Sequence, residues 1–137
     1  MITDLSELGE DVYCPYCNKK TKLVDSSVIY GKSYGLIYLC TKCKAYVGVH
    51  KGTTKPLGTP ASKRLRALRR QVHSYLDELW LHSPKSKKSK ERKNTYAWLS
   101  KQLNIPIEKT HVGMFNESQC IEAIELLREE LIRRNNL

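Results

Sequence analysis

The sequence lacks three features that would place it at once in a large class of proteins. No run approaches the roughly 18 to 20 apolar residues that a membrane-spanning helix needs. The first residues, MITDLSELGED, have neither the basic start nor the apolar stretch of a secretory signal. At 137 residues the chain is too short for a multi-domain enzyme. We therefore expect a soluble cytoplasmic protein without a membrane partner.

Catalytic patterns are also missing. The chain has four His residues, and none has a carboxylate or a nucleophile at a spacing that would support a catalytic triad. We expect His73, His82 and His111 to be structural or exposed. The sequence thus predicts a protein that is not an enzyme and has no small-molecule substrate. A nuclease built around His50 or His111 is the least favoured hypothesis.

Acidic residues are few, and the excess of positive charge is concentrated. The chain has 24 Lys and Arg against 14 Asp and Glu, for a formal net charge of +10. Residues 63–70 (KRLRALRR) carry five cations and no acid, and residues 85–93 (KSKKSKERK) carry six cations and one acid. These two segments account for the whole net charge. Such concentration favours polyanions, most often nucleic acid, although an acidic protein surface would also satisfy it.

Composition separates the chain into four parts. Residues 1–12 form a short acidic segment, and residues 13–52, rich in Cys, Tyr and β-branched residues, favour β structure. Residues 53–60, with Gly and Pro, indicate a linker. Residues 61–137 are predicted to be helical, with a basic loop at 83–93 that is flexible from Ser83 to Lys90. We expect an α+β fold, in which a zinc ribbon of three short antiparallel strands precedes a small bundle of about three helices.

Three helices follow from capping signals and apolar periodicity. The first is expected to begin with Thr59 as N-cap and Pro60 at its first position. The second covers about residues 92–103, and the third starts near Asn116, whose side chain forms a capping box with Gln119. The predicted apolar stripe of the first helix comprises Leu65, Leu68, Val72, Tyr75, Leu76 and Leu79. That of the third comprises Cys120, Ile121, Ile124, Leu127, Leu131 and Ile132.

Two Cys-x-x-Cys pairs carry the strongest functional signal. Cys14 and Cys17 are separated by 22 residues from Cys40 and Cys43. Two-residue spacing lets a tight turn aim both sulfurs at one ion, and two such turns complete a tetrahedral Cys₄ shell. The intervening chain offers strands over 22–30 and 34–39, and a third follows over 45–49. The pattern predicts a zinc ribbon with one structural Zn²⁺.

The same cysteines have two alternative uses. A redox CxxC pair would need a βαβ setting that the sequence does not offer. The same four thiolates could hold an iron–sulfur cluster, which colour would reveal. The fifth cysteine, Cys120, lies on the apolar stripe of the third helix and is expected to be packed in the core.

Several exposed groups are candidates for phosphate contact. The predicted nucleic-acid-binding residues are Lys63, Arg66, Arg70, Lys85, Lys87, Lys88 and Lys90. The segment His50, Lys51, Gly52 and Thr53 is either a phosphate-binding loop or a plain surface loop. Six of the eight Tyr lie in the ribbon among Lys residues. They either stack on single-stranded nucleic acid or cover a thin core, and the two interpretations have equal weight.

Five segments together resemble an uncharacterised family of phage and prophage proteins named for a zinc-finger-containing domain. They are CPYC, LVDSSVIYGKSYGLIYLC, AYVGVHKGTTKPLGTPA, YAWLSKQLNIP and HVGMFNESQC, and the resemblance runs from about Tyr13 to Leu127. It implies a zinc module at the four cysteines and a phage or prophage origin, hence the host cytoplasm. Members often have Cys where this chain has Val49, and the KSKKSKERK run is an expanded loop relative to the family pattern.

The leading hypothesis is a zinc-ribbon protein that binds DNA or RNA through its basic helix and Lys-rich loop. The alternative is a phage-encoded interaction module that binds and modulates a host protein, meeting an acidic surface with its cations.

Overall fold

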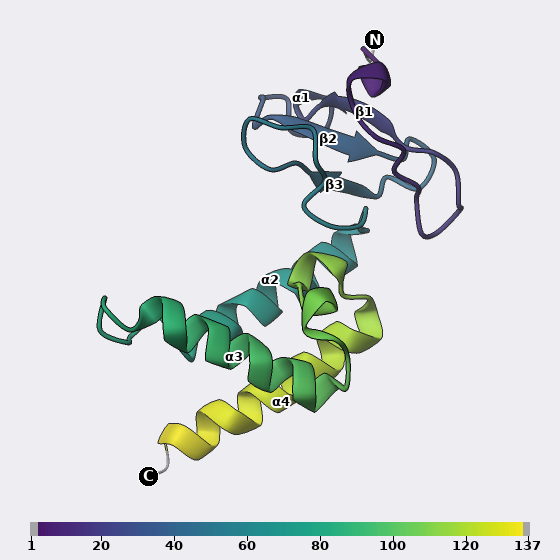
Figure 1. Ribbon diagram of the computed structural model, residues 1–137. Helices are drawn as coiled ribbons and strands as arrows, with labels where there is room; N and C mark the ends of the chain where they lie inside the picture. The colour runs from purple at the N-terminus through teal and green to yellow at the C-terminus, as the bar shows by residue number, and fades with distance from the viewer. Residues whose placement is uncertain (1–2, 136–137) are drawn as a thin grey trace. The chain divides into compact units, whose positions relative to one another are not determined.

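The computed structural model describes residues 3–135. It divides into two compact units between Arg64 and Leu65, close to the predicted end of the linker. The first unit contains a small antiparallel sheet and the second contains helices (Figure 1). The predicted α+β class, with a ribbon followed by helices, is confirmed. Within residues 3–135 no helix is long and apolar enough to cross a membrane.

The sheet has three strands in the order β1-β2-β3. They are β1 (Lys22–Asp25), β2 (Leu36–Leu39) and β3 (Tyr46–Gly48), and both pairings are antiparallel. Leu23 lies opposite Tyr38, which lies opposite Val47, and these side chains form one buried cluster with Val12. Alternate residues form a second cluster, made of Val24, Ile37, Leu39 and Tyr46. The sheet therefore buries apolar side chains on both faces.

The predicted strand over residues 22–30 is wrong beyond Asp25. Ser27–Tyr30 forms a short helix, α1, which ends at Gly31 in the left-handed conformation. Asp25 Oδ1 accepts a hydrogen bond from the Ser27 N–H at 2.8 Å, and Ser26 Oγ accepts one from the Tyr34 N–H at 2.7 Å. Side chains of Asp and Ser thus satisfy backbone groups locally and favour a turn over continued sheet.

The first long helix begins later than predicted. Helix α2 spans Lys63–Glu78, so neither Thr59 nor Pro60 begins it. Ala61 pairs instead with Tyr46 of β3, through hydrogen bonds from Tyr46 N to Ala61 O at 3.1 Å and from Ala61 N to Tyr46 O at 3.0 Å. This bridge holds the chain in an extended conformation up to Ala61 and delays the helix.

The predicted basic loop at 83–93 is wrong over its second half. Helix α3 spans Lys88–Leu103, so Lys88 and Lys90 are helical. Lys, Glu and Arg are good helix formers, and their propensity favours a helix even in this Ser/Lys-rich run, whose composition suggested a loop. Helix α3 ends at Leu103 as predicted, and Asn104 follows in the left-handed conformation.

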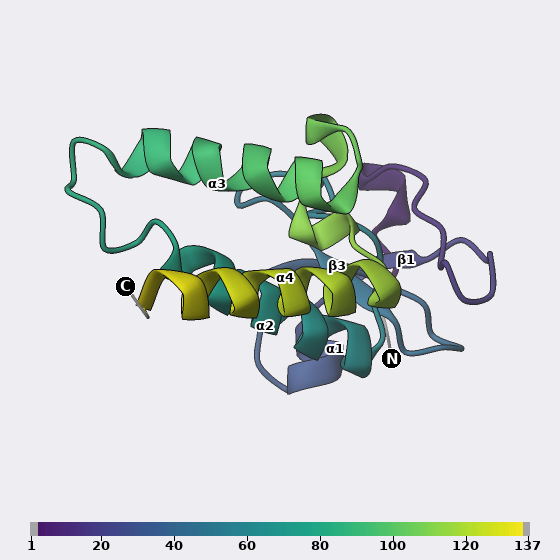
Figure 2. The ribbon, with the colours of Figure 1, turned by 90° about the horizontal axis from the view of Figure 1, so that it is seen from below.

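The third predicted helix is α4 (Glu117–Asn135). Its capping box is confirmed, because the Gln119 N–H donates to Asn116 Oδ1 at 2.8 Å and the Asn116 N–H donates to Gln119 Oε1 at 3.0 Å. Three one-turn 3₁₀ helices, η1 (Ser6–Leu8), η2 (Ile107–Lys109) and η3 (Val112–Met114), complete the described elements. Figure 2 shows α3 and α4 running in opposite directions.

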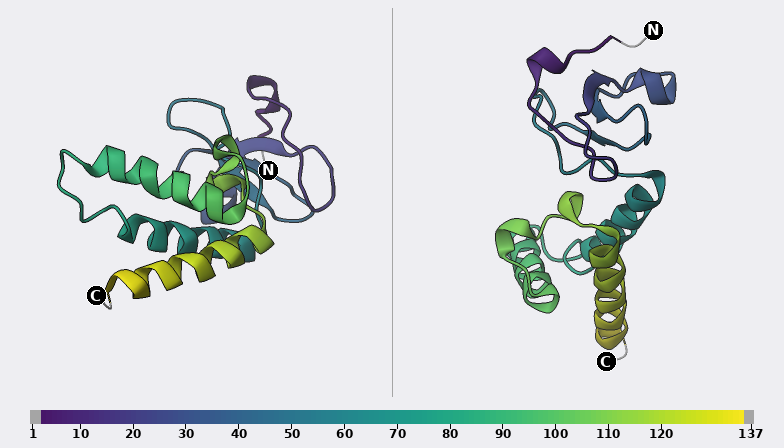
Figure 3. Two further views of the ribbon diagram at one scale, coloured as in Figure 1. Left: turned by 60° about the horizontal axis from the view of Figure 1, so that its bottom comes forward. Right: turned by 90° about the vertical axis from the view of Figure 1, so that its right-hand side faces the viewer.

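The helical unit buries fewer of the predicted stripe residues than expected. Ile121 and Ile132 of α4 are exposed, whereas Cys120, Ala123 and Leu127 are buried. In α2 the buried face is Leu65, Arg69, Val72 and Leu76. Arg69 Nη2 donates to the Phe115 carbonyl at 2.9 Å and Arg69 Nε donates to it at 3.1 Å. The left panel of Figure 3 shows the three long helices side by side.

Candidate metal centre

The first Cys-x-x-Cys pair forms a tight turn at the start of the ribbon. The Cys14 N–H donates to the Lys19 carbonyl at 2.9 Å, and the Asn18 N–H donates to the Cys14 carbonyl at 2.8 Å. Asn18 has a φ of 62°, in the left-handed region that Asn tolerates better than most residues. This reversal brings the sulfur of Cys17 back toward that of Cys14.

The second pair repeats the same construction after β2. The Cys40 N–H donates to the Ala45 carbonyl at 2.9 Å, and the Lys44 N–H donates to the Cys40 carbonyl at 2.8 Å. Lys44 has a φ of 61°, at the position equivalent to Asn18. The Cys43 N–H points at Cys40 Sγ at 3.4 Å. Both turns therefore direct their backbone N–H groups and their sulfurs inward.

The structure brings the four predicted cysteines together. Their Sγ atoms all lie within 4.8 Å of one another, and Cys17 Sγ is 3.7 Å from Cys40 Sγ. A tetrahedral zinc site with Zn–S bonds of about 2.3 Å places its sulfurs about 3.8 Å apart. Cys14 and Cys40 are buried, and Cys17 and Cys43 are partly buried. The donor set and its spacing fit a closed four-thiolate metal site.

The proton equilibria of these thiols show why the cluster needs a cation. Burial raises the pKa of Cys40, but the Cys43 N–H and the neighbouring thiols outweigh burial and lower it to about 7. Burial and the neighbouring thiols raise the pKa of Cys43 to about 12, and burial raises that of Cys14. Four thiolates at this distance repel one another, so a divalent cation is needed to stabilise all four in ionised form.

Comparison with known protein families identifies the same feature. The model of a family described as a zinc-finger-containing domain matches residues 10–130. The chain belongs to this family. The match covers the four-cysteine cluster and most of the helical unit, and together with the cluster it supports zinc as the metal of this zinc-finger-containing domain. No curated protein and no solved structure matches the chain significantly.

The predicted phosphate-contacting residues of the domain lie in two separate places. Lys63, Arg66 and Arg70 occupy the first two turns of α2, where Lys63 and Arg70 are exposed and Arg66 is half-buried. Lys85 and Lys87 lie in the turn before α3, and Lys88 and Lys90 lie in its first turn. In the helical unit the second group lies beyond the C-terminal end of α2, because α3 runs back alongside that helix (Figure 2). The structure does not bring the two groups together.

The segment from His50 to Thr53 forms a turn closed by its own backbone. The Thr53 N–H donates to the His50 carbonyl at 3.0 Å, and Gly52 has a φ of 75° that a residue with a side chain would not adopt easily. His50 and Lys51 are exposed. Cys120 is buried as expected, and burial raises its pKa to about 11. It lies outside the four-cysteine cluster.

Sequence reasoning missed two features. The apolar stripe predicted for the first helix does not include Arg69. This residue follows Leu65 by four positions and precedes Val72 by three, and this spacing puts all three on one face of α2. The other is an aromatic groove in the ribbon unit, which gathers Tyr30, Tyr34 and Tyr46 from separate elements. Of the six ribbon tyrosines, Tyr38 and Tyr46 are buried and the other four are exposed.

Proposed function

We propose that the chain is a zinc-ribbon protein that binds nucleic acid. One zinc ion, held by the four cysteines, has a structural role, because four thiolates leave no open coordination position for a substrate or a water. The cations of α2 and of the start of α3 contact phosphates. The positions of these cations on their helices carry the proposal.

The cations stand where helix stability alone would not select them. The N-terminal end of a helix carries partial positive charge, so each cation there is unfavourable by about 0.3 to 1 kcal/mol at low salt. Helix α2 has no acidic residue in its first turn, and it begins with Lys63. Helix α3 begins with Lys88 and Lys90, and Glu91 is the acidic residue of its first turn. Binding of a polyanion offsets this cost.

These cations differ from those that have structural partners. Arg133 and Arg134 pair with Glu130, and Lys20 pairs with Asp11 at 2.8 Å. In residues 3–135, six of the seven predicted contact residues make no ion pair: Lys63, Arg70, Lys85, Lys87, Lys88 and Lys90. Their ammonium and guanidinium groups remain available for phosphates.

The separation of the two basic groups suits an extended polyanion. From Arg66 to the end of α2 is about 18 Å at a rise of about 1.5 Å per residue. One nucleic acid strand spans that distance with about five phosphates at about 3.4 Å each. A single phosphate or a small anion would not meet both groups.

The test is a titration of fluorescent single-stranded and duplex DNA and RNA with the zinc-loaded chain at two salt concentrations. Binding should weaken steeply with salt. A Lys63→Ala, Arg66→Ala, Arg70→Ala variant should bind about 10-fold or more weaker at low salt, and its slope of log K against log salt should be smaller by about 2 to 3. A Lys85→Ala, Lys87→Ala, Lys90→Ala variant should behave similarly.

The matched control removes three exposed cations elsewhere in the helical unit, as Lys101→Ala, Lys109→Ala, Arg128→Ala. The net charge changes by the same amount, so this variant should lose much less affinity. An equal loss would overturn the assignment of the contacts to α2 and α3. Absence of binding at low salt would overturn the function, and a defined complex from nuclease-treated lysate would then support a protein partner for the basic surface.

A further inference from the structure

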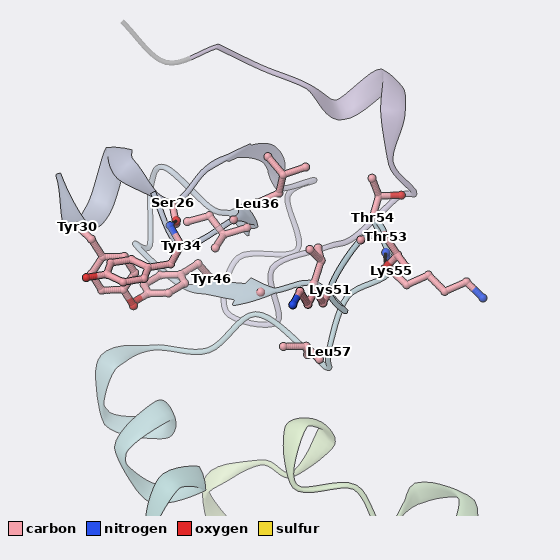
Figure 4. Close-up of a pocket in the computed structure, with 15 residues that line it drawn as sticks. Ser26, Tyr30, Tyr34, Leu36, Tyr46, Lys51, Thr53, Thr54, Lys55 and Leu57 are labelled. Carbon is pink, nitrogen blue, oxygen red and sulfur yellow. Dashed lines mark hydrogen bonds between the residues drawn. The ribbon is translucent and has the colours of Figure 1, made fainter. Parts of the chain in front are cut away.

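The ribbon unit contains an open groove of about 1200 Å³ that the metal site does not use (Figure 4). One wall is aromatic and comes from α1, the turn after it and β3. The other wall is the segment from Lys51 to Leu57, which follows β3. All of these residues belong to the first unit. The groove is therefore a property of the ribbon itself.

Three tyrosines form the aromatic wall. The rings of Tyr30 and Tyr34 lie edge to face with centroids 5.5 Å apart, and those of Tyr30 and Tyr46 lie edge to face at 6.0 Å. The hydroxyls of Tyr30 and Tyr46 form a hydrogen bond. Tyr46 is 8% exposed and belongs to the sheet core, whereas Tyr34 is 72% exposed. The buried ring thus fixes the cluster, and Tyr34 is the ring of the three that is most accessible to a ligand.

Hydrogen bonds fix the opposite wall, which is the segment from Lys51 to Leu57. Tyr38, which is almost fully buried, donates its hydroxyl to the Thr54 carbonyl at 2.6 Å. The His50 N–H donates to the Lys55 carbonyl at 2.9 Å, which closes the turn. A side chain from the sheet core therefore fixes the distance between this turn and the tyrosines, so the groove exists before a ligand binds.

Cations flank the aromatic wall. The Lys32 amine lies 5.8 Å from the centre of the Tyr34 ring. In Figure 4 the amine of Lys51 is turned toward the tyrosines, whereas Lys55 points away from them. The lining residues, all within the described chain, include no Asp or Glu. An aromatic face between ammonium groups, without a carboxylate, suits a planar group attached to an anion.

The geometry points to a binding site for single-stranded nucleic acid, in which an unstacked base lies against Tyr34 and its phosphates meet Lys32 and Lys51. This inference rests on the proposed function and adds to it the form of nucleic acid that is preferred. Aromatic side chains stack on any base that is free of its own stack, and they cannot reach bases stacked within a duplex. The cations of α2 and α3 contact phosphates in either form, whereas the groove selects the single strand.

The experiment compares a fluorescent oligothymidine, the duplex of the same length, and a strand of that length without bases, all against the zinc-loaded full chain. Tyr34→Ala should weaken oligothymidine binding about 10-fold and leave the duplex and the baseless strand unchanged. Lys51→Ala should lower the salt slope for the single strand by about 1. Tyr13→Ala is the matched control, because Tyr13 is 57% exposed in the same unit but outside the groove, and it should bind like the parent chain.

The outcomes separate this inference from the proposed function. If Tyr34→Ala binds oligothymidine like the parent while the α2 variant loses affinity, the groove assignment is wrong and the proposed function stands. If Tyr34→Ala loses affinity equally for duplex and single strand, the base-stacking role is also wrong. If the parent chain binds none of the three probes, both proposals fail. An unchanged melting temperature of Tyr34→Ala, expected from the exposure of this ring, excludes loss of fold as the cause.

Discussion

The ribbon unit and the helical unit are built on different physical principles. The ribbon buries two small clusters of apolar side chains, one on each face of a sheet whose strands have three or four residues. The helical unit has three helices of 16 to 19 residues and fully buries large side chains such as Phe115, Leu76, Leu99 and Leu127. Because short strands provide little apolar burial, we expect the ribbon to depend on a bound metal for its stability and the helices to depend on packing.

Removal of the metal should produce the largest difference in stability between the two units. Structural zinc contributes about 10 kcal/mol to the folding of small zinc modules, and chelation should therefore unfold the ribbon. Helical circular dichroism should remain, while the signals of the ribbon tyrosines in near-ultraviolet dichroism should collapse. Because protons compete for the thiolates, lower pH should release the metal in the same way.

The cysteine variants refine this test. Cys17→Ser should lose zinc and unfold the ribbon, whereas Cys120→Ala, outside the cluster, should keep one zinc per chain by metal analysis. Simultaneous loss of helical dichroism on chelation would contradict the view that the helices are stabilised independently of the metal.

Truncation of a core side chain should destabilise the helical unit and leave the metal site intact. Leu127 is fully buried in α4, and Leu127→Ala should destabilise the helical unit by about 2 to 5 kcal/mol through lost burial and a residual cavity. Its zinc content should not change. Ile132→Ala on the same helix is the control, because Ile132 is 56% exposed and its truncation should stay within about 0.5 kcal/mol. Denaturant titration followed by helical dichroism measures both, and a similar loss for the two variants would contradict the assignment of the core.

Two neighbouring arginines allow the packing and the binding roles to be told apart. Arg69 is buried and donates two hydrogen bonds to the Phe115 carbonyl, whereas Arg70 is exposed. Arg69→Met should lower stability by about 1 to 3 kcal/mol, since it removes these donors from a buried carbonyl. Arg70→Met should leave stability unchanged and weaken nucleic acid binding.

Both arginine variants lose one positive charge, so each controls for the other. Thermal unfolding measures the stability of the two variants, and a salt-dependent titration measures their binding to nucleic acid. If Arg69→Met melts like the parent chain, its hydrogen bonds to Phe115 are not important for folding.

Local signals in the sequence predicted the parts of the structure that depend on near neighbours. The two-residue spacing of each cysteine pair is such a signal, and the cysteines do gather. The Asn116 and Gln119 capping box is another, because both partners lie within one turn. The end of α3 at Leu103 was also predicted from its sequence neighbours.

The failures come from tertiary contacts. The bridge between Ala61 and Tyr46 makes α2 begin later than predicted, and no sequence pattern near Ala61 predicts that it pairs with β3. The groove joins Tyr30, Tyr34 and Tyr46, whose approach depends on α1, where the sequence predicted a strand. The sequence identified the residues of the two basic groups but not their distance from each other. One group lies at the start of α2 and the other lies beyond its C-terminal end, because α3 runs back alongside α2.

The smallest expected effect concerns the two metal-binding turns. Asn18 and Lys44 occupy equivalent left-handed positions, with φ of 62° and 61°, and Lys tolerates this conformation less well than Asn. Lys44→Gly should relieve strain of about 1 kcal/mol, partly offset by the greater flexibility of unfolded Gly, and so raise the stability of the ribbon by a few tenths of a kcal/mol. Lys44→Val should lower it, because a β-branched residue is the least suited to positive φ. Competition with a chelator, followed by the tyrosine signal, would rank the three. Equal metal retention by the Gly and Val variants would show that this turn bears no strain, and the ribbon would then depend on its thiolates alone.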